Sequence, residues 1–506
     1  MVISMRKSII VFALLLIAGI GGVCYVNSTL RAAQDNVMFT GVEAYGDVSA
    51  ADGLTVSVGA HLDYHLLWDS AHTFGQTPRT HTDFSFHPSQ LHWMPEFVSV
   101  PLSLSIPIEV NASASGGSLL DDSEGSLIFN TEFIGVYDML RDVASRTQNG
   151  VQRTETIFLR DYFDYYPVSA YIGAEPYYYA RQADTQNISQ TPDEARINEA
   201  FSDFFRFQVP EERTIKVTIR KDSAGNVVEI GSGRVSLGYT SGSSVVSEED
   251  IVYIYAISVE TEKGIYFAIS AGGISGFSNI PGGFGIYLLP AATIISDADT
   301  EYLPTLDYWN LQTVYPLSES ITIHSLTLSE DGSCLNLITY EDGGCFLTVI
   351  ELEGMAEKQK MPLFEDMGDI FLYTINYVDG LLYAALSDNR FMLAEKNADN
   401  TYRPLLAGAR DHFLSFEDFN DWNVPQIAWD GERLAIVSRY RRSIVVDDDV
   451  LNYASVDSCG FTIEVYDESG LMYKGAFASS LDVFTIIGGA FDVCRLIDTG
   501  GLSARW

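Results

Sequence analysis

Basic residues are scarce in this chain of 506 residues: 30 lysines and arginines stand against 68 aspartates and glutamates, and the formal net charge is −38. An electrostatic field of that sign repels phosphate groups, so nucleic acid is excluded as a partner. Hydrophobic residues nevertheless make up 47% of the chain. That fraction is ample for a buried core, so global disorder is excluded as well.

Cysteine is also rare, with five residues in the whole chain. A hairpin turn at Asp342-Gly343 would set Cys334 opposite Glu351, about 20 Å along the strand from Cys345. Bridged cysteines need Cα atoms within about 7 Å of each other, which excludes a bond between Cys334 and Cys345. Neither a disulfide framework nor the ligand spacing of a zinc site is present.

The common catalytic motifs are missing too. The chain has no HExxH motif, and the sequence GISGF around Ser275 does not fit the nucleophile elbow. The glycine-rich segment 272–290 lacks the Lys-Ser/Thr pair of a phosphate-binding loop. The acidic segments 297–301 and 447–449 lack the central glycine of a calcium loop. We therefore predict no catalytic residue and no cofactor, although these absences leave the enzyme question open.

The N-terminal segment differs from the rest of the chain. Residues 8–26, SIIVFALLLIAGIGGVCYV, are uncharged and follow Arg6 and Lys7. A helix of this length, at about 1.5 Å rise per residue, crosses most of a hydrocarbon core about 30 Å thick. The basic pair stays in the cytoplasm. We expect residues 1–7 to be a cytoplasmic stub and 8–26 a transmembrane signal-anchor, with residues 27–45 as a linker.

This interpretation predicts a single-pass protein of the cell membrane whose body lies outside the cytoplasm. Two alternatives stay open at this point. Cleavage after Ser28 is possible, because Val26 and Ser28 are small enough for a cleavage site, and it would release the body from the membrane. Lipidation of Cys24 would anchor it differently, although Val23 is larger than the residue usual at that position.

The last third of the chain repeats one plan, in which β-rich runs are joined by tight turns. Asp-Gly pairs at 331–332, 379–380 and 430–431 are spaced 48 and 51 residues apart. Asp-Gly between β-rich runs is a strong hairpin signal, because it tolerates positive φ. Units of four strands that recur about every 40–50 residues have the spacing of propeller blades. These segments thus resemble the blades of β-propeller repeat proteins.

The resemblance concerns the pattern and no family signature. Trp429-Asp430 lacks the accompanying Gly-His of a WD40 repeat. More loosely, a single anchor before an acidic, β-rich body is similar to uncharacterised single-anchor surface proteins of Gram-positive bacteria. That similarity implies a location and no activity.

Upstream, further turn signals fall at 149–150, 225–226 and 263–264. Residues 192–206 carry helix-start signals, namely Pro192 in the first turn and acidic residues after it, and they predict a short helical insertion. No linker divides the remainder. We therefore predict an all-β fold, with residues 46–506 forming one β-propeller of six to eight four-stranded blades behind the transmembrane helix.

The stretch GAHLDYHLLWDSAHTFG (59–75) is the candidate metal site. From Leu54 to Leu66, hydrophobic residues alternate with small and polar ones, which predicts one strand with two unlike faces. His61, Asp63 and His65 would then share the polar face and could bind zinc or iron. The candidate ligands are His61, Asp63, His65 and His72. The alternatives are a pH-responsive patch and an ordinary polar surface, and we favour the polar surface.

A tyrosine-rich segment follows, RDYFDYYPVSAYIGAEPYYYARQ (160–182). Tyrosine offers a flat apolar ring with a polar tip, which suits sugar rings or an extended peptide. Ordinary packing in strands is the alternative. The candidate ligand-binding residues are Tyr162, Tyr165, Tyr166, Tyr177, Tyr178 and Tyr179.

These observations favour a membrane-anchored extracytoplasmic β-propeller that acts as a non-catalytic binding or scaffolding module. Its partner would be a protein or a glycan. The alternative is a cell-surface glycan hydrolase or lyase with two carboxylates at the mouth of the propeller channel, because such enzymes use a pair of carboxylates about 5–10 Å apart.

Overall fold

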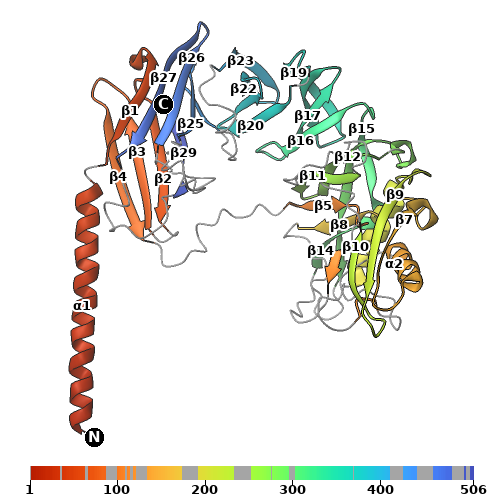
Figure 1. Ribbon diagram of the computed structural model, residues 1–506. Coiled ribbons are helices and arrows are strands. Elements are labelled where there is room, and N and C mark those ends of the chain that lie inside the picture. The colour runs from red at the N-terminus through yellow and green to blue at the C-terminus, as the bar shows by residue number, and fades with distance from the viewer. Residues whose placement is uncertain are drawn as a thin grey trace, which may run out of the picture. The chain divides into compact units, whose positions relative to one another are not determined.

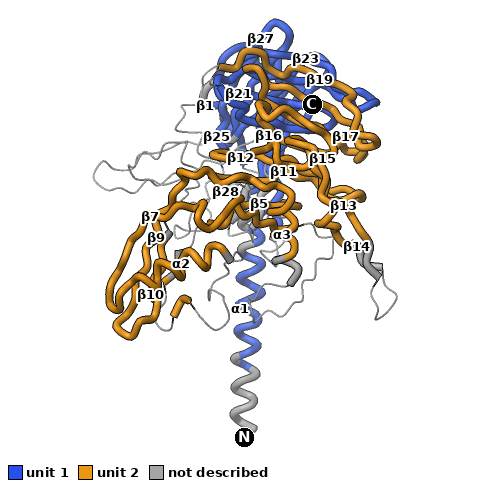
Figure 2. Tube along the Cα trace, turned by 90° about the vertical axis from the view of Figure 1, so that its right-hand side faces the viewer, with its two compact units in different colours: residues 1–98, 369–506 blue, residues 99–368 orange. Residues whose placement is uncertain are grey.

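The chain folds into two compact units, residues 1–98 with 369–506 (unit 1) and residues 99–368 (unit 2) (Figure 2). The fold is given by a computed structural model. It describes residues 2–34, 37–62, 66–86, 100–108, 111–113, 118–120, 134–173, 192–232, 252–274, 276–295, 302–368, 370–410, 425–440, 460–480, 495–496 and 502–506.

Unit 1 contains the long helix α1 and, among its described residues, three antiparallel sheets (Figure 1). The helix α1 runs from Val2 to Gln34. The C-terminal sheet consists of β1 (Phe39–Gly46), β24 (Gln426–Trp429), β25 (Leu434–Tyr440), β26 (Gly460–Asp467) and β27 (Gly470–Ser479). The N-terminal sheet consists of β2 (Thr55–Leu62), β3 (Leu66–Thr73), β4 (Arg79–Phe86), β28 (Arg495–Leu496) and β29 (Leu502–Arg505). The third sheet consists of β20 (Leu372–Val378), β21 (Leu381–Leu386), β22 (Arg390–Lys396) and β23 (Tyr402–Ala409).

The two ends of the chain exchange strands in unit 1. Strand β1, which precedes the N-terminal sheet in sequence, pairs with β27 of the C-terminal sheet. In return, β29 at the end of the chain pairs with β2 of the N-terminal sheet. Each sheet therefore contains backbone from both ends of the chain.

The C-terminal sheet is buried on both faces. Along β25, Ala435 and Val437 belong to one core cluster, while Leu434 and Ile436 belong to another. The first cluster also contains Val56 and Val58 of the N-terminal sheet, and the second contains Tyr383 and other residues of the β20–β23 sheet. Burial on both faces explains why LAIV reads as a continuous hydrophobic run and lacks alternation.

One ion pair is buried between the β20–β23 sheet and the C-terminal sheet. Arg410, directly after β23, donates from Nε to Oε2 of Glu464 on β26 over 2.9 Å. Their side chains are 16% and 5% exposed. Tyr466 donates to the same carboxylate over 2.9 Å. Burial alone would lower the pKa of Arg410, but the Glu464 carboxylate raises it above its ordinary value.

Unit 2 combines further antiparallel sheets with two helices. The helices are α2 (Ile134–Arg146) and α3 (Pro192–Phe205). Its strands are β5 (Leu102–Ser105), β6 (Asn111–Ser113), β7 (Gln152–Phe158), β8 (Ser169–Ile172), β9 (Thr214–Lys221), β10 (Val227–Ser232), β11 (Tyr253–Thr261), β12 (Gly264–Gly272), β13 (Gly285–Ile295), β14 (Tyr302–Leu306), β15 (Gln312–Pro316), β16 (Thr322–Leu328), β17 (Cys334–Glu341), β18 (Gly344–Glu351) and β19 (Ala356–Phe364). Strands β16 to β19 form a four-stranded sheet in sequence order, whereas another sheet has the order β6-β10-β9-β7.

The hairpin predictions are largely confirmed. Each of the three Asp-Gly pairs joins two neighbouring antiparallel strands, β16 to β17, β20 to β21 and β24 to β25. Asp379 and Gly380 both have positive φ, 49° and 77°. In the turns at 331–332 and 430–431 only the glycine does, and the aspartate side chain instead accepts backbone N–H groups two residues on. Cys334 pairs with Glu351, as predicted, and both Cys334 and Cys345 are free.

Two predictions about helices had different outcomes. The expected insertion at 192–206 is α3, which ends at Phe205. The turn at 149–150, expected between two strands, instead connects α2 to β7. Residues Val136, Met139, Leu140 and Val143 of α2 are fully buried in the core of unit 2.

The N-terminal helix α1 extends beyond the expected segment 8–26 at both ends. Its described large apolar side chains are more than half exposed. Within the described part of the chain, no helix is both long enough and apolar enough for a membrane span.

Candidate functional site

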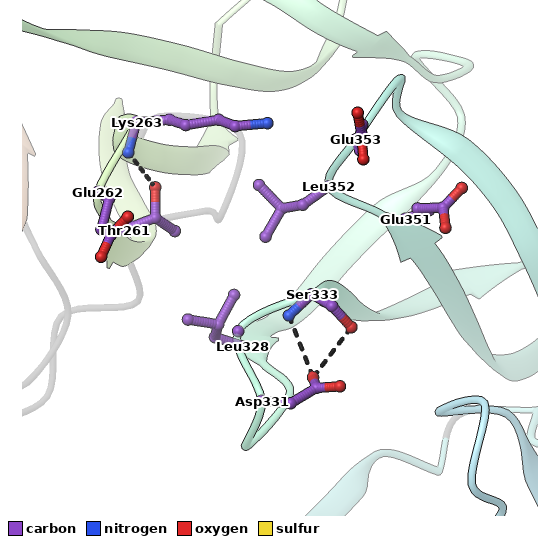
Figure 3. A pocket seen from close by; sticks show the side chains of 10 residues that line it. Thr261, Glu262, Lys263, Leu328, Asp331, Ser333, Glu351, Leu352 and Glu353 are labelled. Atoms are coloured by element: carbon purple, nitrogen blue, oxygen red, sulfur yellow. Dashed lines mark hydrogen bonds between the residues drawn. The ribbon is translucent and has the colours of Figure 1, made fainter.

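A hollow of about 540 Å³ lies in unit 2, where three hairpin turns of two sheets meet (Figure 3). The turns are residues 261–263 between β11 and β12, residues 328–333 between β16 and β17, and residues 351–353 between β18 and β19. Volumes of about 300–1,000 Å³ are usual for small-molecule sites. The hollow therefore has the size to hold part of a small ligand or one side chain of a larger one.

Hydrogen bonds within each turn fix the lining residues. At the first turn the hydroxyl of Thr261 donates to the carbonyl of Gly264 over 2.9 Å and accepts the Lys263 N–H over 3.2 Å. At the second, Oδ1 of Asp331 accepts the N–H and the hydroxyl of Ser333 over 3.1 and 2.9 Å (Figure 3). The hydroxyl of Ser329 donates to the same oxygen over 2.7 Å. These bonds hold the Asp331 carboxylate at the rim.

Negative charge dominates the lining. Four carboxylates, those of Glu262, Asp331, Glu351 and Glu353, stand against the single ammonium of Lys263. Glu351 also faces Lys358 at 3.8 Å. In Figure 3 the side chain of Leu352 lies in the middle of the view, with the Lys263 side chain extending above it, Glu351, Glu353 and Asp331 on the right and below, and Glu262 on the left.

Such a lining has a defined chemistry. Carboxylate oxygens accept hydrogen bonds and attract ammonium and guanidinium groups. The buried side chain of Leu352 and the partly buried Leu328 supply an apolar wall for a methylene chain. The arrangement therefore suits a cationic side chain with an aliphatic stem.

The predicted single strand over residues 54–66 is wrong, and the histidine face expected on it stays a prediction. Residues 54–66 do not form one strand, because β2 ends at Leu62 and pairs with Leu66, the first residue of β3. Asp63 and His65 lie outside the described residues, and His61 is described only by its backbone, paired with Leu67. The alternation itself holds up to Val58, with Leu54 and Val56 fully buried.

The fourth candidate metal ligand, His72, is 4% exposed and packed among phenylalanine rings. Among the residues that the structure describes, no group of three or more His, Cys, Asp or Glu side chains is arranged to hold a metal ion.

The predicted tyrosine face is divided between different environments. Tyr166 is 1% exposed and belongs to the core, whereas Tyr165 is 45% exposed. Tyr162 donates to Oδ2 of Asp142 on α2 over 2.7 Å. Burial first, and this hydrogen bond second, raise the pKa of Tyr162 to about 12. The remaining candidates, Tyr177, Tyr178 and Tyr179, lie outside the described residues.

No protein-family model matches the chain, and no curated protein matches it. Among solved structures, the chain is similar to PpgL, a periplasmic gluconolactonase of Pseudomonas aeruginosa, at 14% identity over 53% of this chain and 64% of that one, with a TM-score of 0.21. It is similar to a candidate 6-phosphogluconolactonase from Bacteroides fragilis at 11% identity over 90% and 99% of the two chains, with a TM-score of 0.27. It is also similar to the Cps50 (Swd1) β-propeller domain of Myceliophteria thermophila at 9% identity over 52% and 80%, with a TM-score of 0.19. Likenesses at this level carry no argument about activity.

Proposed function

We propose that this chain is an extracytoplasmic β-propeller, held at the membrane by its N-terminal segment, that binds a cationic ligand without transforming it. The observation that carries the binding role is the hollow of unit 2, where four carboxylates surround an apolar wall. The overall charge of −38 supports a cationic ligand, because the field of the whole chain attracts it.

Two features support a propeller. Sets of four neighbouring strands in sequence order recur at β16–β19, at β20–β23 and at β24–β27, where β1 adds a fifth strand. In addition, the exchange of β1 and β29 between the sheets at the two ends of the chain is a means of closing a ring of sheets. A closed ring removes free edges that would otherwise pair with other chains.

The location is supported by the N-terminal segment. Arg6 and Lys7 precede the uncharged run 8–26, and Leu14, Leu15, Leu16 and Ile17 of α1 are each more than half exposed. Four consecutive helical residues, about 100° apart, surround the helix, so an apolar environment would satisfy every side of it. Protease added to intact cells should degrade the body, and protection of residues 46–506 would refute the proposed location.

The binding role is tested by titrating the full chain with a tetralysine peptide in a calorimeter at low ionic strength. In the Glu262→Gln/Glu353→Gln variant the peptide should bind severalfold more weakly, because two exposed carboxylates that line the same hollow are neutralised. The matched control, Glu211→Gln/Glu212→Gln, removes two exposed charges from another turn of unit 2 and should bind as the wild type does.

Three outcomes would contradict the proposal. Equal weakening in both variants would show non-specific attraction to an acidic surface. A lack of peptide binding by the wild type would remove the cationic ligand class. Release of reducing sugar from cell-wall glycan by the wild type, absent in the Glu262→Gln/Glu353→Gln variant, would replace the binding module with a glycan hydrolase.

A further inference from the structure

His72 is a buried titratable residue of unit 1, and it takes no part in the binding proposed for the hollow of unit 2. It lies on β3, opposite Val56 of β2 and Thr80 of β4. Its side chain faces the core, and the residue is 4% exposed. Its Nδ1 atom is hydrogen-bonded to Oγ1 of Thr80 over 2.9 Å.

Phenylalanine rings surround the imidazole. Its centroid lies 5.7 Å from the ring of Phe39, 6.1 Å from that of Phe461 and 5.8 Å from that of Phe477. Those three rings belong to β1, β26 and β27 of the C-terminal sheet. The ring of Phe74, directly after β3, is 4.9 Å away. His72 therefore occupies the contact between the two sheets that the ends of the chain build.

No described carboxylate faces the imidazole to stabilise a positive charge. In the core cluster of the C-terminal and N-terminal sheets, the other described titratable side chain is Tyr473, whose phenol is neutral in acid and whose pKa burial raises further. Arg433 lies at the edge of that cluster, where it donates to the carbonyl of Ala50 over 2.6 Å and its guanidinium carbon lies 4.2 Å from the centre of the Trp506 ring.

The described charged side chains in the middle of β3, β4, β26 and β27 lie on the opposite faces. Asp69, His81 and Asp83 of β3 and β4 are exposed. Glu464 of β26 is bound to Arg410, on the side of the β20–β23 sheet. Lys474 of β27 pairs with Glu464 across the two strands and shares its face. These positions leave the imidazole in an apolar environment.

We propose that His72 is an acid-sensitive latch between the N-terminal and C-terminal sheets, and that protonation of its imidazole loosens their contact. A charged imidazolium in this core would lose its hydration and gain only weak cation–π contacts with phenylalanine. The two sheets can rehydrate it by separating. Because each sheet holds a strand from the other end of the chain, a loosened contact frees both ends together.

The direction of the pH effect follows from burial, which lowers the pKa of His72 below 6.5. The unfolded or opened state then binds a proton more readily than the closed state. The contribution of His72 to stability is complete above about pH 6.5 and is lost as the pH falls towards the lowered pKa. The opening equilibrium constant should rise by at most about tenfold per pH unit, the limit for one proton.

Protonation of Asp69 has the opposite effect on the stability of the folded state. Although the residue as a whole is exposed, partial burial of its carboxyl group first, and then Asp83, raise the pKa of Asp69 above 3.8, so its protonation favours the folded state as the pH falls. The carboxyl groups of Asp47, Asp430 and Asp467 have lowered pKa values, so their contributions to stability are lost only below about pH 4. Acid loosening of this contact above about pH 5 is therefore assigned to the histidine.

The test is hydrogen exchange of the full chain at about pH 7.5 and about pH 5.5, read by mass spectrometry and corrected for intrinsic rates. A local readout is needed because burial also lowers the pKa of His324 in unit 2. In the wild type, peptides from β1, β3 and β27 should exchange severalfold faster in acid, whereas β21 should not change. In His72→Leu the acid effect in those three strands should be absent, and in His81→Gln it should equal that of the wild type.

The comparison of the wild type at the two pH values tests the latch even if the His72→Leu protein fails to fold. Equal protection of β1, β3 and β27 at the two pH values would overturn the latch. So would an acid effect that survives in a folded His72→Leu protein.

Discussion

At the residue scale, the polar groups whose loss should most affect stability are the buried ones. Glu464 is 4% exposed and still accepts hydrogen bonds from Arg410 and Tyr466. Such a pair contributes little net stability compared with apolar residues of the same volume, but the loss of one partner leaves an uncompensated charge in the core. We therefore expect the ion pair to disfavour arrangements of the β20–β23 sheet and the C-terminal sheet that separate Arg410 from Glu464.

Substitution of Arg410 tests this role. We expect Arg410→Met to lower the free energy of unfolding by about 3–5 kcal/mol, because the Glu464 carboxylate is left buried without its cation. The double variant Arg410→Met/Glu464→Leu should recover most of that loss. The matched control is Arg403→Met, which breaks the exposed pair with Glu395 and should cost less than about 1 kcal/mol. Urea unfolding followed by circular dichroism provides the measurement, and equal effects at the two arginines would contradict the argument.

At the scale of the element, the turns were predictable and the limits of the strands were not. Asp-Gly marks a turn through its backbone preference, which is local, and all three predicted pairs join neighbouring strands. Alternation does not mark where a strand ends, so residues 54–66 look like one strand although they belong to β2 and β3. In α2 the spacing of Val136, Met139, Leu140 and Val143 has the helical period, but a turn at 149–150 is equally compatible with a strand before it.

The hollow of unit 2 could not be predicted from sequence. Its lining comes from three turns, at 261–263, 328–333 and 351–353, that are brought together only by the packing of one sheet beside another. The sequence did contain a weak signal, since each turn carries at least one acidic residue. Acidic turns are common on a chain of this charge, so the signal identifies the hollow only after the fold is known.

Gly264, the first residue of β12, follows the 261–263 turn that lines the hollow of unit 2. It has a φ of 129°, and a Cβ atom there would lie 2.1 Å from the carbonyl oxygen of Leu289. We expect Gly264→Ala to displace the 261–263 turn and lower the urea midpoint strongly, with a cost above about 2 kcal/mol, because both the backbone conformation and the contact are unfavourable. Gly343→Ala is the control, since its φ is 79° and nothing lies within 4 Å of the added atom. The control should cost about 1 kcal/mol, and an equal cost at the two sites would mean that the close approach is unimportant.

At the scale of the whole molecule, residues near the C-terminus pack against a core that residues 39–74 help to build. Leu502, Ala504 and Trp506 pack against the cluster shared by the N-terminal and C-terminal sheets. This arrangement makes the stability of residues near the start of the chain depend on residues at its end. Neither end could be assigned to a sheet from sequence, because strands of four to eight residues carry too little pattern to reveal a partner more than 400 residues away.

Removal of residues 502–506 tests how far the stability of the N-terminal sheet depends on the C-terminal residues. The truncation deletes the pairing of β29 with Thr55, Val56, Ser57 and Val58 of β2. Several backbone hydrogen bonds worth about 1 kcal/mol each are lost together with apolar packing. We expect about 2–4 kcal/mol less protection of β2 in hydrogen exchange, and no change in β17 of unit 2. The control Ser503→Ala/Arg505→Ala alters two exposed side chains and keeps the backbone pairing, so it should leave β2 protected. If the truncated chain protects β2 as well as the wild type does, strand exchange between the chain ends does not stabilise the N-terminal sheet, and the support it lends to a closed propeller is withdrawn.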